Sequence, residues 1–489
     1  MRVALLTACL LAAASLVAGS GAAERSKSSS SSFVTQSGTH LLLAGRPYRF
    51  GGANIEWLGL AGYGPSDPSG PHYASHYEID DALATARELG ATVVRSQTMG
   101  DSAGCSACIE PELGLFNDAA FERIDYALAS ARAHGIRIIA TLVGDDALSG
   151  GTGCVYLGWR GISVPNCSLV NMEPFWTDPT VIGDVEQHIA AVLGHVNVYT
   201  HVAYKNDPTI LGWDLVNGGG SPPAWTRVIG RFIRGIDGRH LILSDASNAR
   251  FSVVDACVAF VYPHWGLTPA VAKPKIAACR AAHKPFLAYE YGWDRTNFPT
   301  VRALRSFLGS LQANPEVSGD AFWALQAHND GHGWMPIPAD VTDPVAAARV
   351  ESGEWWALYY PGVKTLVTSA ADMATRAQAL RSHNYAMQGA SLPAHAVPPA
   401  PTITSAVYGQ VGSTQVYWQG SAGSENYSVQ RAPAAGGPWL TVCRRCVTDR
   451  SDGYIDNAAA AKDGWYRVVP YNLDGKPGPA SRPRQASAS

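Results

Sequence analysis

The sequence predicts a (β/α)8 TIM barrel followed by a small all-β sandwich of the immunoglobulin-like type. Two observations lead to this fold class. Up to residue 387, eight short apolar runs alternate with helical patterns, as expected of parallel strands that are buried on both faces. Beyond a Pro/Ala-rich stretch the pattern changes to short alternating runs separated by Gly, Ser and Asn, which is typical of a sandwich. The predicted barrel strands span 48–54, 92–97, 136–143, 210–217, 240–245, 256–263, 285–292 and 319–326.

Helical patterns between these strands support the alternation. Segments 78–90 and 116–135 carry apolar residues at helical spacing, and each ends on a glycine, Gly90 or Gly135, which is a helix stop signal. Eight strand–helix units over about 350 residues fit a barrel with long loops. An open, doubly wound sheet is the alternative. No GxGxxG motif follows the first strand, however, so we expect no dinucleotide and no other cofactor.

The chain divides into five predicted segments. Residues 1–23 contain an early arginine, an apolar stretch and small residues at the end, as in a secretory signal peptide. We therefore expect a secreted protein, either extracellular or periplasmic. A Ser-rich tether, the barrel domain, a Pro/Ala linker and the sandwich follow, with expected ranges of 24–32, 33–387, 388–402 and 403–486. Around Trp418, Tyr427 and "WYRVVPYNLDGKPGPAS" the sandwich resembles a fibronectin type III module, which implies a spacer or a weak binding surface.

Composition narrows the class of partner. Apolar residues make up 46% of the chain and charged residues 16%, and the net charge is −3. This balance is typical of a loop-rich globular protein and gives no reason to expect nucleic acid or an anionic membrane as a partner. After residue 23, no segment approaches the ~18–20 apolar residues that a membrane span needs. A neutral polysaccharide or oligosaccharide fits the charge balance, and we expect a monomer.

Cysteine spacing predicts disulfides rather than a metal site. Nine cysteines are present, and eight remain if Cys9 leaves with the signal peptide, an even number suited to an oxidising compartment. Two CxxC units could suggest zinc, but they fall in different predicted domains. Likewise, "HNDGHGW" (328–334) places two histidines in a glycine-rich loop rather than on one helix face, so we predict no metal site. Spacing alone leaves the connectivity open; the local pairs are Cys105/Cys108, Cys154/Cys167, Cys257/Cys279 and Cys443/Cys446.

Polar residues at the ends of the predicted strands are the candidate site, because the active site of such a barrel lies at the carboxyl ends of its strands. Glu290 is the leading candidate, since it is an ionisable residue in an apolar, aromatic run with Tyr289, Tyr291 and Trp293 around it. The full set at the strand ends comprises Asn54, Arg95, Asp145, Asp146, Asn217, Asp245, Tyr262, Glu290 and Trp323.

These residues resemble those of the retaining glycoside hydrolases of family 5, most closely the secreted endo-β-1,4-mannanases, over about residues 33–345. The resemblance lies in segment 31–59 and in "VVRSQ", "ILGWDLVN", "VAFVYPHWG", "KPFLAYEYGWD" and "AFWAL". It implies that Glu290 is the nucleophile, that Arg95 orients it and that Tyr262 lies beside it. It also implies that Asn217 binds the sugar 2-hydroxyl and that Trp323 stacks on a sugar ring. Further aromatic residues are expected to line a sugar groove, because aromatic rings offer large apolar faces; they are Trp57, Trp265 and Trp293.

Two positions depart from the family pattern. The family places its general acid/base Glu directly after the strand-four Asn, where this chain has Gly218, and a His two residues before the Tyr, where this chain has Phe260. Retaining hydrolysis uses two carboxyls about 5–5.5 Å apart. Without proton transfer the rate typically falls by about 10²–10⁴-fold. Carboxylates that could replace the vacant acid/base position are Glu56, Asp101, Asp145, Asp146 and Asp245.

Three functional interpretations follow. The first is a secreted glycosidase that acts on a β-linked, mannan-type polysaccharide through Glu290. The second is a binding protein, a pseudoenzyme that retains the sugar groove without the acid/base chemistry. The third is a transglycosylating or specialised enzyme whose substrate carries a good leaving group. Retention of Arg95, Asn217, Tyr262, Glu290 and Trp323 favours an enzyme, whereas Gly218 and Phe260 favour the binding protein.

Overall fold

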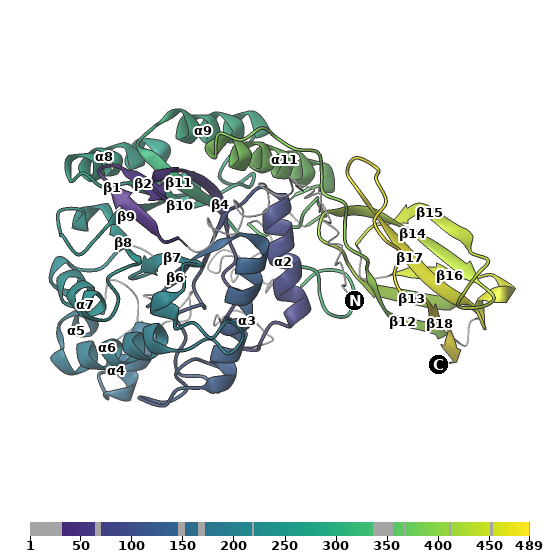
Figure 1. Cartoon of the computed structure of the whole chain (residues 1–489), viewed down its shortest axis with the longest axis horizontal. Helices are drawn as coiled ribbons and strands as arrows, with labels where there is room; N and C mark the ends of the chain where they lie inside the picture. The colour runs from purple at the N-terminus through teal and green to yellow at the C-terminus, as the bar shows by residue number, and fades with distance from the viewer. Residues whose placement is uncertain are drawn as a thin grey trace, which may run out of the picture.

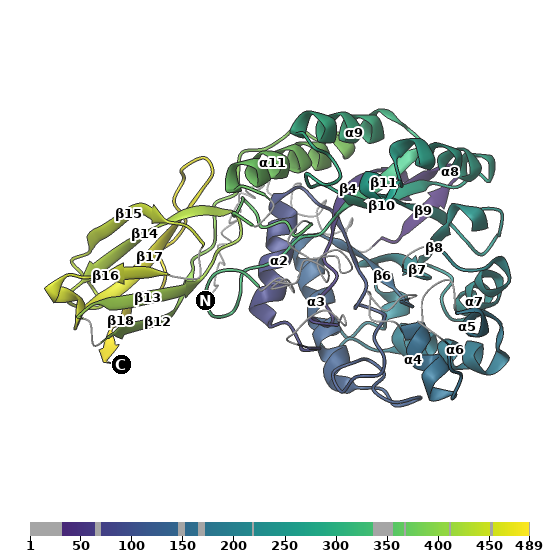
Figure 2. The same ribbon diagram turned by 180° about the vertical axis from the view of Figure 1, so that it is seen from behind.

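The computed structural model shows two parts, a barrel with its surrounding helices and a smaller all-β unit beside it (Figure 1). The view from behind shows the same separation, with the all-β unit lying against the side of the barrel that carries α2 (His76–Glu88) and α11 (Ala370–Met387) (Figure 2). The structure describes residues 32–63, 70–144, 152–164, 172–217, 220–335, 356–365, 368–409, 412–449 and 453–488.

The first part is a closed barrel of eight parallel strands, as the sequence predicts. The strands are β4 (Phe50–Asn54), β5 (Val93–Ser96), β6 (Arg137–Thr141), β7 (Ile210–Asp214), β8 (Leu241–Asp245), β9 (Ala256–Val261), β10 (Phe286–Gly292) and β11 (Val317–Trp323). Their order around the barrel follows the chain, and β11 closes it by pairing with β4. Each predicted strand is found within a few residues of its expected range. The (β/α)8 prediction is therefore confirmed.

The amino-terminal end of the barrel is covered by a small antiparallel sheet, which the sequence analysis did not predict. Strands β1 (Val34–Ser37), β2 (His40–Leu43) and β3 (Arg46–Tyr48) form this sheet. Val34 and Leu41 are buried in the same apolar cluster as Phe50 and Val93, which begin β4 and β5. Because the sheet occupies that end, the opposite end, where the strands terminate, is the open face available for a site.

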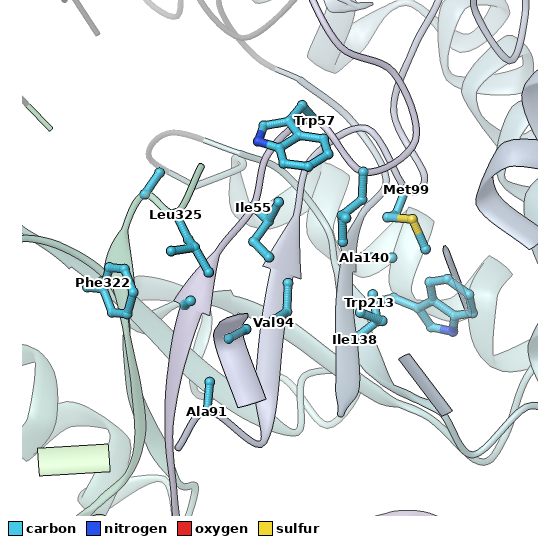
Figure 3. Packing of buried hydrophobic residues seen from close by; sticks show 14 of the residues in the cluster. Ile55, Trp57, Ala91, Val94, Met99, Ile138, Ala140, Trp213, Phe322 and Leu325 are labelled. Atoms are coloured by element: carbon cyan, nitrogen blue, oxygen red, sulfur yellow. The ribbon is translucent and has the colours of Figure 1, made fainter. Parts of the chain in front are cut away.

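Helices pack around the strands and bury a second, larger cluster between the two layers. Figure 3 shows part of it, with Ile55, Val94, Ile138 and Phe322 filling the space beside β4, β5 and β6. Helix α2 begins with a capping box, in which the side chains of Ser75 and Glu78 each accept a hydrogen bond from the backbone N–H of the other residue. The other α-helices of the described residues are α3 (Asp118–His134), α4 (Thr152–Trp159), α5 (Glu173–Thr177), α6 (Pro179–Gly194), α7 (Pro223–Ile236), α8 (Pro269–Ala281) and α9 (Val301–Ala313). No helix in the described ranges combines the length and apolar character that crossing a membrane requires.

The second part consists of two four-stranded sheets. It follows α11 after a stretch without helix or strand at 390–401. Its strands are β12 (Thr402–Tyr408), β13 (Thr414–Gln419), β14 (Ser424–Ala432), β15 (Leu440–Val447), β16 (Tyr454–Asp456), β17 (Trp465–Asn472), β18 (Arg484–Gln485) and β19 (Ser487–Ala488). The sheets run in the orders β16-β13-β12-β19 and β15-β14-β17-β18. Residues from both, including Val416, Tyr427 and Val468, share one apolar core, which is consistent with the predicted sandwich.

The two parts contact each other through the loop that follows β11. Trp334 Nε1 donates to the Asp449 backbone carbonyl at 3.0 Å, and Thr404 Oγ1 donates to the Gly331 carbonyl at 2.7 Å. Tyr77 of α2 also reaches the all-β unit, since its hydroxyl donates to the Gly420 carbonyl at 3.2 Å. The loop after the last barrel strand therefore lies between the barrel and the second unit.

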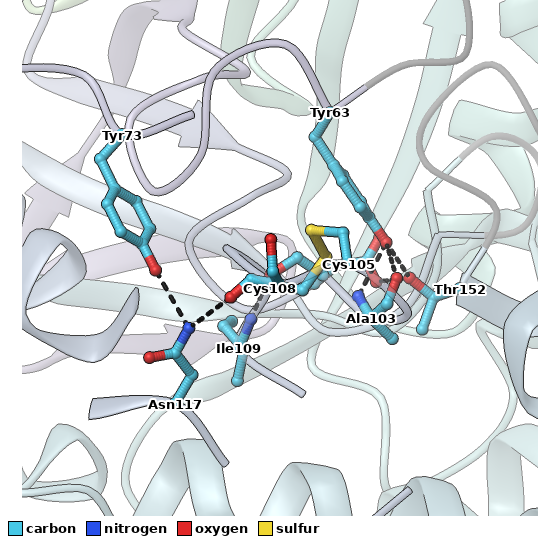
Figure 4. The surroundings of a disulfide bond; sticks show 11 residues. Tyr63, Tyr73, Ala103, Cys105, Cys108, Ile109, Asn117 and Thr152 are labelled. Carbon is cyan, nitrogen blue, oxygen red and sulfur yellow. Dashed lines mark hydrogen bonds between the residues drawn. A yellow bond between two sulfur atoms is a disulfide. The ribbon is translucent and has the colours of Figure 1, made fainter. Parts of the chain in front are cut away.

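Two of the predicted cysteine pairs are disulfides, Cys105–Cys108 and Cys443–Cys446. Figure 4 shows the first in a loop beside Tyr63, Ala103 and Thr152. Cys154 is also disulfide-bonded, and its expected partner, Cys167, lies outside the described residues.

The expectation that the eight cysteines form disulfides is wrong for Cys257 and Cys279, because both are free and buried. The two thiols nevertheless lie together, on β9 and α8, and Cys279 hydrogen-bonds with Cys257. The sequence spacing therefore identified neighbours, but the apolar packing between this strand and helix accommodates them as thiols.

Candidate active site

Glu290 lies near the carboxyl end of β10, in a strand whose residues are all buried. Both oxygens of its carboxylate are held. Tyr262 Oη donates to Oε1 at 2.8 Å, and Arg95 Nη1 donates to Oε2 at 2.7 Å. Hydrogen bonds and an ion pair fix the side-chain orientation, and charge-assisted contacts of this kind are the strong ones. Glu290 therefore has a single, well-defined carboxylate position at the barrel mouth.

Arg95 organises the charged groups of the site. Its guanidinium is fully buried and donates to Asp214 Oδ2 at 2.8 Å, to Asn54 Oδ1 at 3.1 Å and to Asn217 Oδ1 at 2.7 Å. It also lies 4.2 Å from the ring centroid of Tyr289. One cation thus connects residues at the ends of four strands, β4, β5, β7 and β10. A buried guanidinium needs such partners to offset its desolvation.

The environment of Glu290 alters its acidity. Burial raises its pKa to about 7, although the charge of Arg95 and the hydrogen bond from Tyr262 act in the opposite direction. The charge of Asp214 adds to the rise. The carboxylate form that attack requires is still present near neutral pH. This carboxylate is more basic than that of an exposed glutamate and is hence a better nucleophile.

Asn217 lies beside this cluster, just after β7. Its backbone N–H donates to the Val143 carbonyl at 2.9 Å, and its Oδ1 accepts from Arg95. Since Arg95 holds the oxygen, the amide nitrogen is the end of the side chain that can donate to a hydroxyl. This placement suits the sugar-binding role that the resemblance implies.

The two departures from the family pattern are at Gly218 and Phe260. Gly218, the vacant acid/base position, lies outside the described residues, as do Asp145 and Asp146. Phe260 lies opposite Glu290 in the β9–β10 pairing and stacks on Tyr289 with ring centroids 5.3 Å apart. An apolar ring thus occupies the place where the resemblance leads one to expect a histidine.

A cavity of about 230 Å³ opens on the side of the mouth formed by β7, β8 and β9. Apolar and aromatic side chains dominate its wall, and the ion pair between Lys275 and Asp245 (2.8 Å) lies at its edge. Residues along the wall include Val216, Gly220, Asp245, Phe260, Leu267 and Tyr289. The cavity adjoins the Glu290 cluster through Phe260 and Tyr289.

The four predicted sugar-stacking tryptophans fall into two groups. Trp323 ends β11 and is partly exposed, and Trp265 is 48% exposed with its ring 4.6 Å from that of Tyr262. Trp293, in contrast, is fully buried and donates its indole N–H to the Trp356 carbonyl at 2.6 Å. Trp57 is only 5% exposed and lies at the top of the apolar cluster above Ile55 (Figure 3). The expected role of Trp293 as a stacking surface is therefore wrong, because its side chain packs in the interior. Trp57 exposes little of its ring for stacking on a sugar.

Some site residues escaped the sequence analysis. Asp214 binds Arg95, and its charge adds to the rise in the pKa of Glu290. A signal for it existed, namely an acidic residue inside the apolar run "ILGWD". Gln326 and Trp356 lie beside Glu56 and Trp323, respectively. They gave no local signal, because both contacts join distant parts of the chain. Within the described residues, no group of three or more His, Cys, Asp or Glu side chains is arranged to hold a metal ion.

Part of the chain is similar in sequence to known proteins. Residues 31–258 match a family model described as "GH family 5 beta-mannosidase-like". A mannan endo-1,4-beta-mannosidase 1 of Oryza sativa subsp. japonica is 31% identical over 218 residues, covering 43% of this chain and 48% of the relative. A mannan endo-1,4-beta-mannosidase 7 of Arabidopsis thaliana is 33% identical over 224 residues, covering 44% of this chain and 48% of the relative. The chain thus spans about half the length of the curated relatives it matches.

Solved structures extend the likeness of fold beyond that region. The endo-beta-1,4-mannanase of Thermotoga petrophila superimposes with a TM-score of 0.55 at 17% identity, covering 90% of this chain and 98% of that chain. The endo-1,4-beta-mannanase of Rhizomucor miehei gives a TM-score of 0.53 at 22% identity, covering 73% and 99%. The family match ends at residue 258, before Tyr262 and Glu290. The barrel is therefore similar in fold to these mannanases and, up to residue 258, similar in sequence to the family 5 β-mannosidases.

Proposed function

We propose that this protein is a secreted glycosidase that cleaves β-linked, mannan-type polysaccharide through Glu290 as the nucleophile of a retaining mechanism. The observation that carries the proposal is the fixed carboxylate of Glu290, with one oxygen bound by Arg95 and the other by Tyr262. A nucleophile held in one orientation reacts without first being reoriented. The names of the relatives, which are mannan endo-1,4-beta-mannosidases, support mannan as the substrate.

The residues of the site suit the first half of this reaction. Glu290 attacks the anomeric carbon and forms a covalent glycosyl ester, while Arg95 and Tyr262 keep its carboxylate aligned. The amide nitrogen of Asn217 donates to the sugar 2-hydroxyl, and partly exposed Trp323 and Trp265 offer rings on which pyranose faces stack. Hydrogen bonds to the 2-hydroxyl strengthen in the transition state of such reactions, so Asn217 contributes to the rate as well as to binding.

A second function is a catalytically impaired carbohydrate-binding protein that retains the groove. The glycine at position 218 and the phenyl ring of Phe260 favour it, because neither can transfer a proton to the leaving oxygen. A specialised enzyme is intermediate between the two. It would act only on substrates whose leaving group departs without protonation, and the apolar cavity next to Phe260 could hold an apolar leaving group of this kind.

One experiment separates these functions. Incubation with 2,4-dinitrophenyl β-mannoside should attach a mannosyl group to Glu290, because dinitrophenolate leaves without a proton. Intact-mass and peptide mass spectrometry would detect the adduct, and the Glu290→Gln variant is the matched control that should remain unmodified. A wild-type protein that binds mannan in affinity electrophoresis but neither labels Glu290 nor releases dinitrophenolate would contradict the enzyme and leave the binding protein.

The remaining parts of the proposal concern the rest of the chain. We propose that residues 1–23 direct export, which agrees with the disulfides in both parts of the molecule, since such bonds persist in oxidising compartments. We also propose that the C-terminal sheets are a fibronectin type III module of the immunoglobulin-like class and that the protein acts as a monomer. Neither nucleic acid nor membrane is proposed as a partner. Cleavage of the expressed chain near Ala23 would test the proposed export. The molar mass measured by light scattering would test whether the protein is a monomer.

A further inference from the structure

The carboxylates considered as replacements for the missing acid/base are not equivalent in the structure. Asp245 is bound by Lys275 and by the Ser247 backbone N–H, both at 2.8 Å, and Asp101 accepts a hydrogen bond from Thr152. Asp145 and Asp146 lie outside the described residues. Among the candidates that the structure describes, Glu56 has surroundings that differ from those of Asp245 and Asp101.

The backbone of Glu56 is fixed at the barrel mouth. It lies two residues beyond β4, and its carbonyl accepts from Thr98 Oγ1 at 2.6 Å and from the Thr98 N–H at 3.2 Å. On the other side, the Leu325 N–H donates to the Asn54 carbonyl at 2.9 Å. The segment that carries Glu56 is thus joined to the loop after β5 and to the segment after β11. The side chain is positioned by backbone contacts on both flanks.

The carboxyl group of Glu56 has no cationic partner among the described residues. Gln326 Nε2 donates to Oε1 at 3.3 Å, whereas Oε2 is buried and accepts from no other described side chain. An ionised carboxylate without a counter-charge is expensive in such a place. Burial accordingly raises the pKa of Glu56 to about 7, and the negative charge of Glu290 adds to the rise.

Glu56 and Glu290 therefore interact electrostatically. Burial moves both pKa values to about 7. The charged groups that face them decide which one holds the proton. Arg95 contacts Glu290 at 2.7 Å and stabilises its carboxylate, whereas no described cation contacts Glu56. Near neutral pH the first proton of the pair thus belongs to Glu56. An acid and a base with opposite protonation states at one site are what retaining glycosidases need.

We propose that Glu56, located after the first barrel strand, supplies and recovers the proton that the fourth-strand glutamate handles in related enzymes. This proposal rests on the proposed function, because it assigns the second carboxyl of that same reaction. Glu56 is then the general acid/base, and Gln326 is a positioning residue that holds its carboxyl group.

The proton and electron balance of the two steps is complete with these residues. In the first step the Glu290 carboxylate forms a bond to the anomeric carbon, and the glycosidic C–O bond breaks. Its electron pair goes to the leaving oxygen, which takes the proton of Glu56. In the second step the Glu56 carboxylate takes a proton from water, and the water oxygen attacks the anomeric carbon. Glu290 leaves as a carboxylate, and Glu56 ends protonated, as it began.

The Glu56→Gln variant tests this role with two substrates. Turnover of β-mannan should fall by about 10²–10⁴-fold, the usual contribution of general acid–base catalysis. The rate at which 2,4-dinitrophenyl β-mannoside labels Glu290 should stay within a few-fold of wild type, because that leaving group needs no proton. The mannosyl adduct should then accumulate, since water lacks a base, and azide should release it as β-mannosyl azide. Labelling also shows that the variant is folded.

Two further variants test whether Glu56 sets the alkaline limb of the kcat/KM profile. Gln326→Met removes the hydrogen bond that lowers the pKa of Glu56, so the alkaline limb of the kcat/KM profile on mannan should move to higher pH. In Glu56→Gln that limb should be lost. Asp245→Asn is the matched control, a mouth carboxylate held by Lys275, and should leave the alkaline limb in place.

The outcomes are distinguishable. If wild type neither labels Glu290 nor releases dinitrophenolate from the aryl mannoside, the proposed function fails, and the role of Glu56 fails with it. If wild type labels Glu290 and Glu56→Gln still turns over mannan with a bell-shaped profile, only the role of Glu56 is overturned. An equal loss on both substrates would also overturn it, because Glu56 would then bind sugar without transferring a proton. The same holds if wild type labels Glu290 but releases nothing from mannan.

Discussion

His328 Nε2 lies 3.0 Å from Asp449 Oδ2, so one ion pair joins the loop after the last barrel strand to the C-terminal sheets. The other ring nitrogen, Nδ1, lies 2.8 Å from Asp81 Oδ2 of helix α2, and the imidazole is fully buried. His328 follows Gln326 by two residues, and Gln326 contacts Glu56. The contact between the two units is therefore close to the segment that shapes the candidate site.

This buried histidine should make stability depend on pH. Burial alone lowers the pKa of His328, but the charges of Asp81 and Asp449 outweigh it and raise the pKa to about 10. Since the folded value exceeds the unfolded value of about 6.5, the stabilisation is complete below about pH 6.5. It is lost as the pH rises to 10. The melting temperature should therefore fall across this window. Asp449→Asn should flatten that fall and lower stability at pH 6 by at most ~3–5 kcal/mol, the usual cost of breaking a buried pair.

Two glycines of the all-β unit test whether a loss of stability is specific to the surroundings of His328. A Cβ at Gly420 would overlap the His328 ring, whereas a Cβ at Gly436 meets nothing within 4 Å. Gly420→Ala should therefore lower the melting temperature and Gly436→Ala should not. A melting temperature that does not change between pH 6 and 10 in wild type would contradict a charged His328.

The hydrogen bond from Tyr262 to Glu290 should be visible in the acid limb of the reaction. It lowers the pKa of Glu290 against the effect of burial. Tyr262→Phe removes the donor, so the pKa of Glu290 should rise and the acid limb of the Glu290 labelling rate should move to higher pH. Because a hydrogen bond to a charged group contributes about 1.5–3 kcal/mol, labelling at pH 6 should slow by roughly 10–100-fold. Tyr291→Phe is the control, since that hydroxyl donates to Asp320 Oδ1 at 3.2 Å; an acid limb unchanged by Tyr262→Phe would exclude this contact.

The free thiols give a direct test of the cysteine arrangement. Cys257 and Cys279 are buried and unbonded, whereas Cys105, Cys108, Cys443 and Cys446 are in disulfides. Alkylation of the denatured, unreduced mature protein should therefore modify Cys257 and Cys279, and neither should react in the native protein. Peptide mass spectrometry would locate the modified residues. Recovery of a Cys257–Cys279 cross-linked peptide would show that the oxidised protein closes this bond.

The sequence predicted the barrel well because each strand is a local apolar run with a polar end. Arg95, Asn217, Tyr262 and Glu290 come together because strand ends of a closed barrel meet at one mouth. The state of Glu56 could not be predicted in this way, since it depends on Gln326, which is 270 residues away in the chain. Burial of Trp293 was missed for a similar reason, because its indole is covered by the segment around Trp356. An aromatic residue next to a strand end can face either the groove or the core, and local sequence does not distinguish them.

Moving the proton donor back to the fourth strand is the most direct test of its relocation. Gly218→Glu in the Glu56→Gln background should restore part of the turnover on mannan, because the resemblance to family 5 implies a carboxyl acid/base at that position. Recovery should be incomplete, since Phe260 stacks on Tyr289 and Gly220 approaches Asp245 so closely that a Cβ would lie 2.7 Å from the Asp245 Cβ. Gly218→Gln is the matched control, of equal size without an acidic proton, and should restore nothing. Mannan turnover and azide dependence would be measured together, and azide should accelerate the Gln control more than the Glu variant. Equal recovery by Glu and Gln would mean that the side chain restores the shape of the loop and that proton transfer limits neither variant.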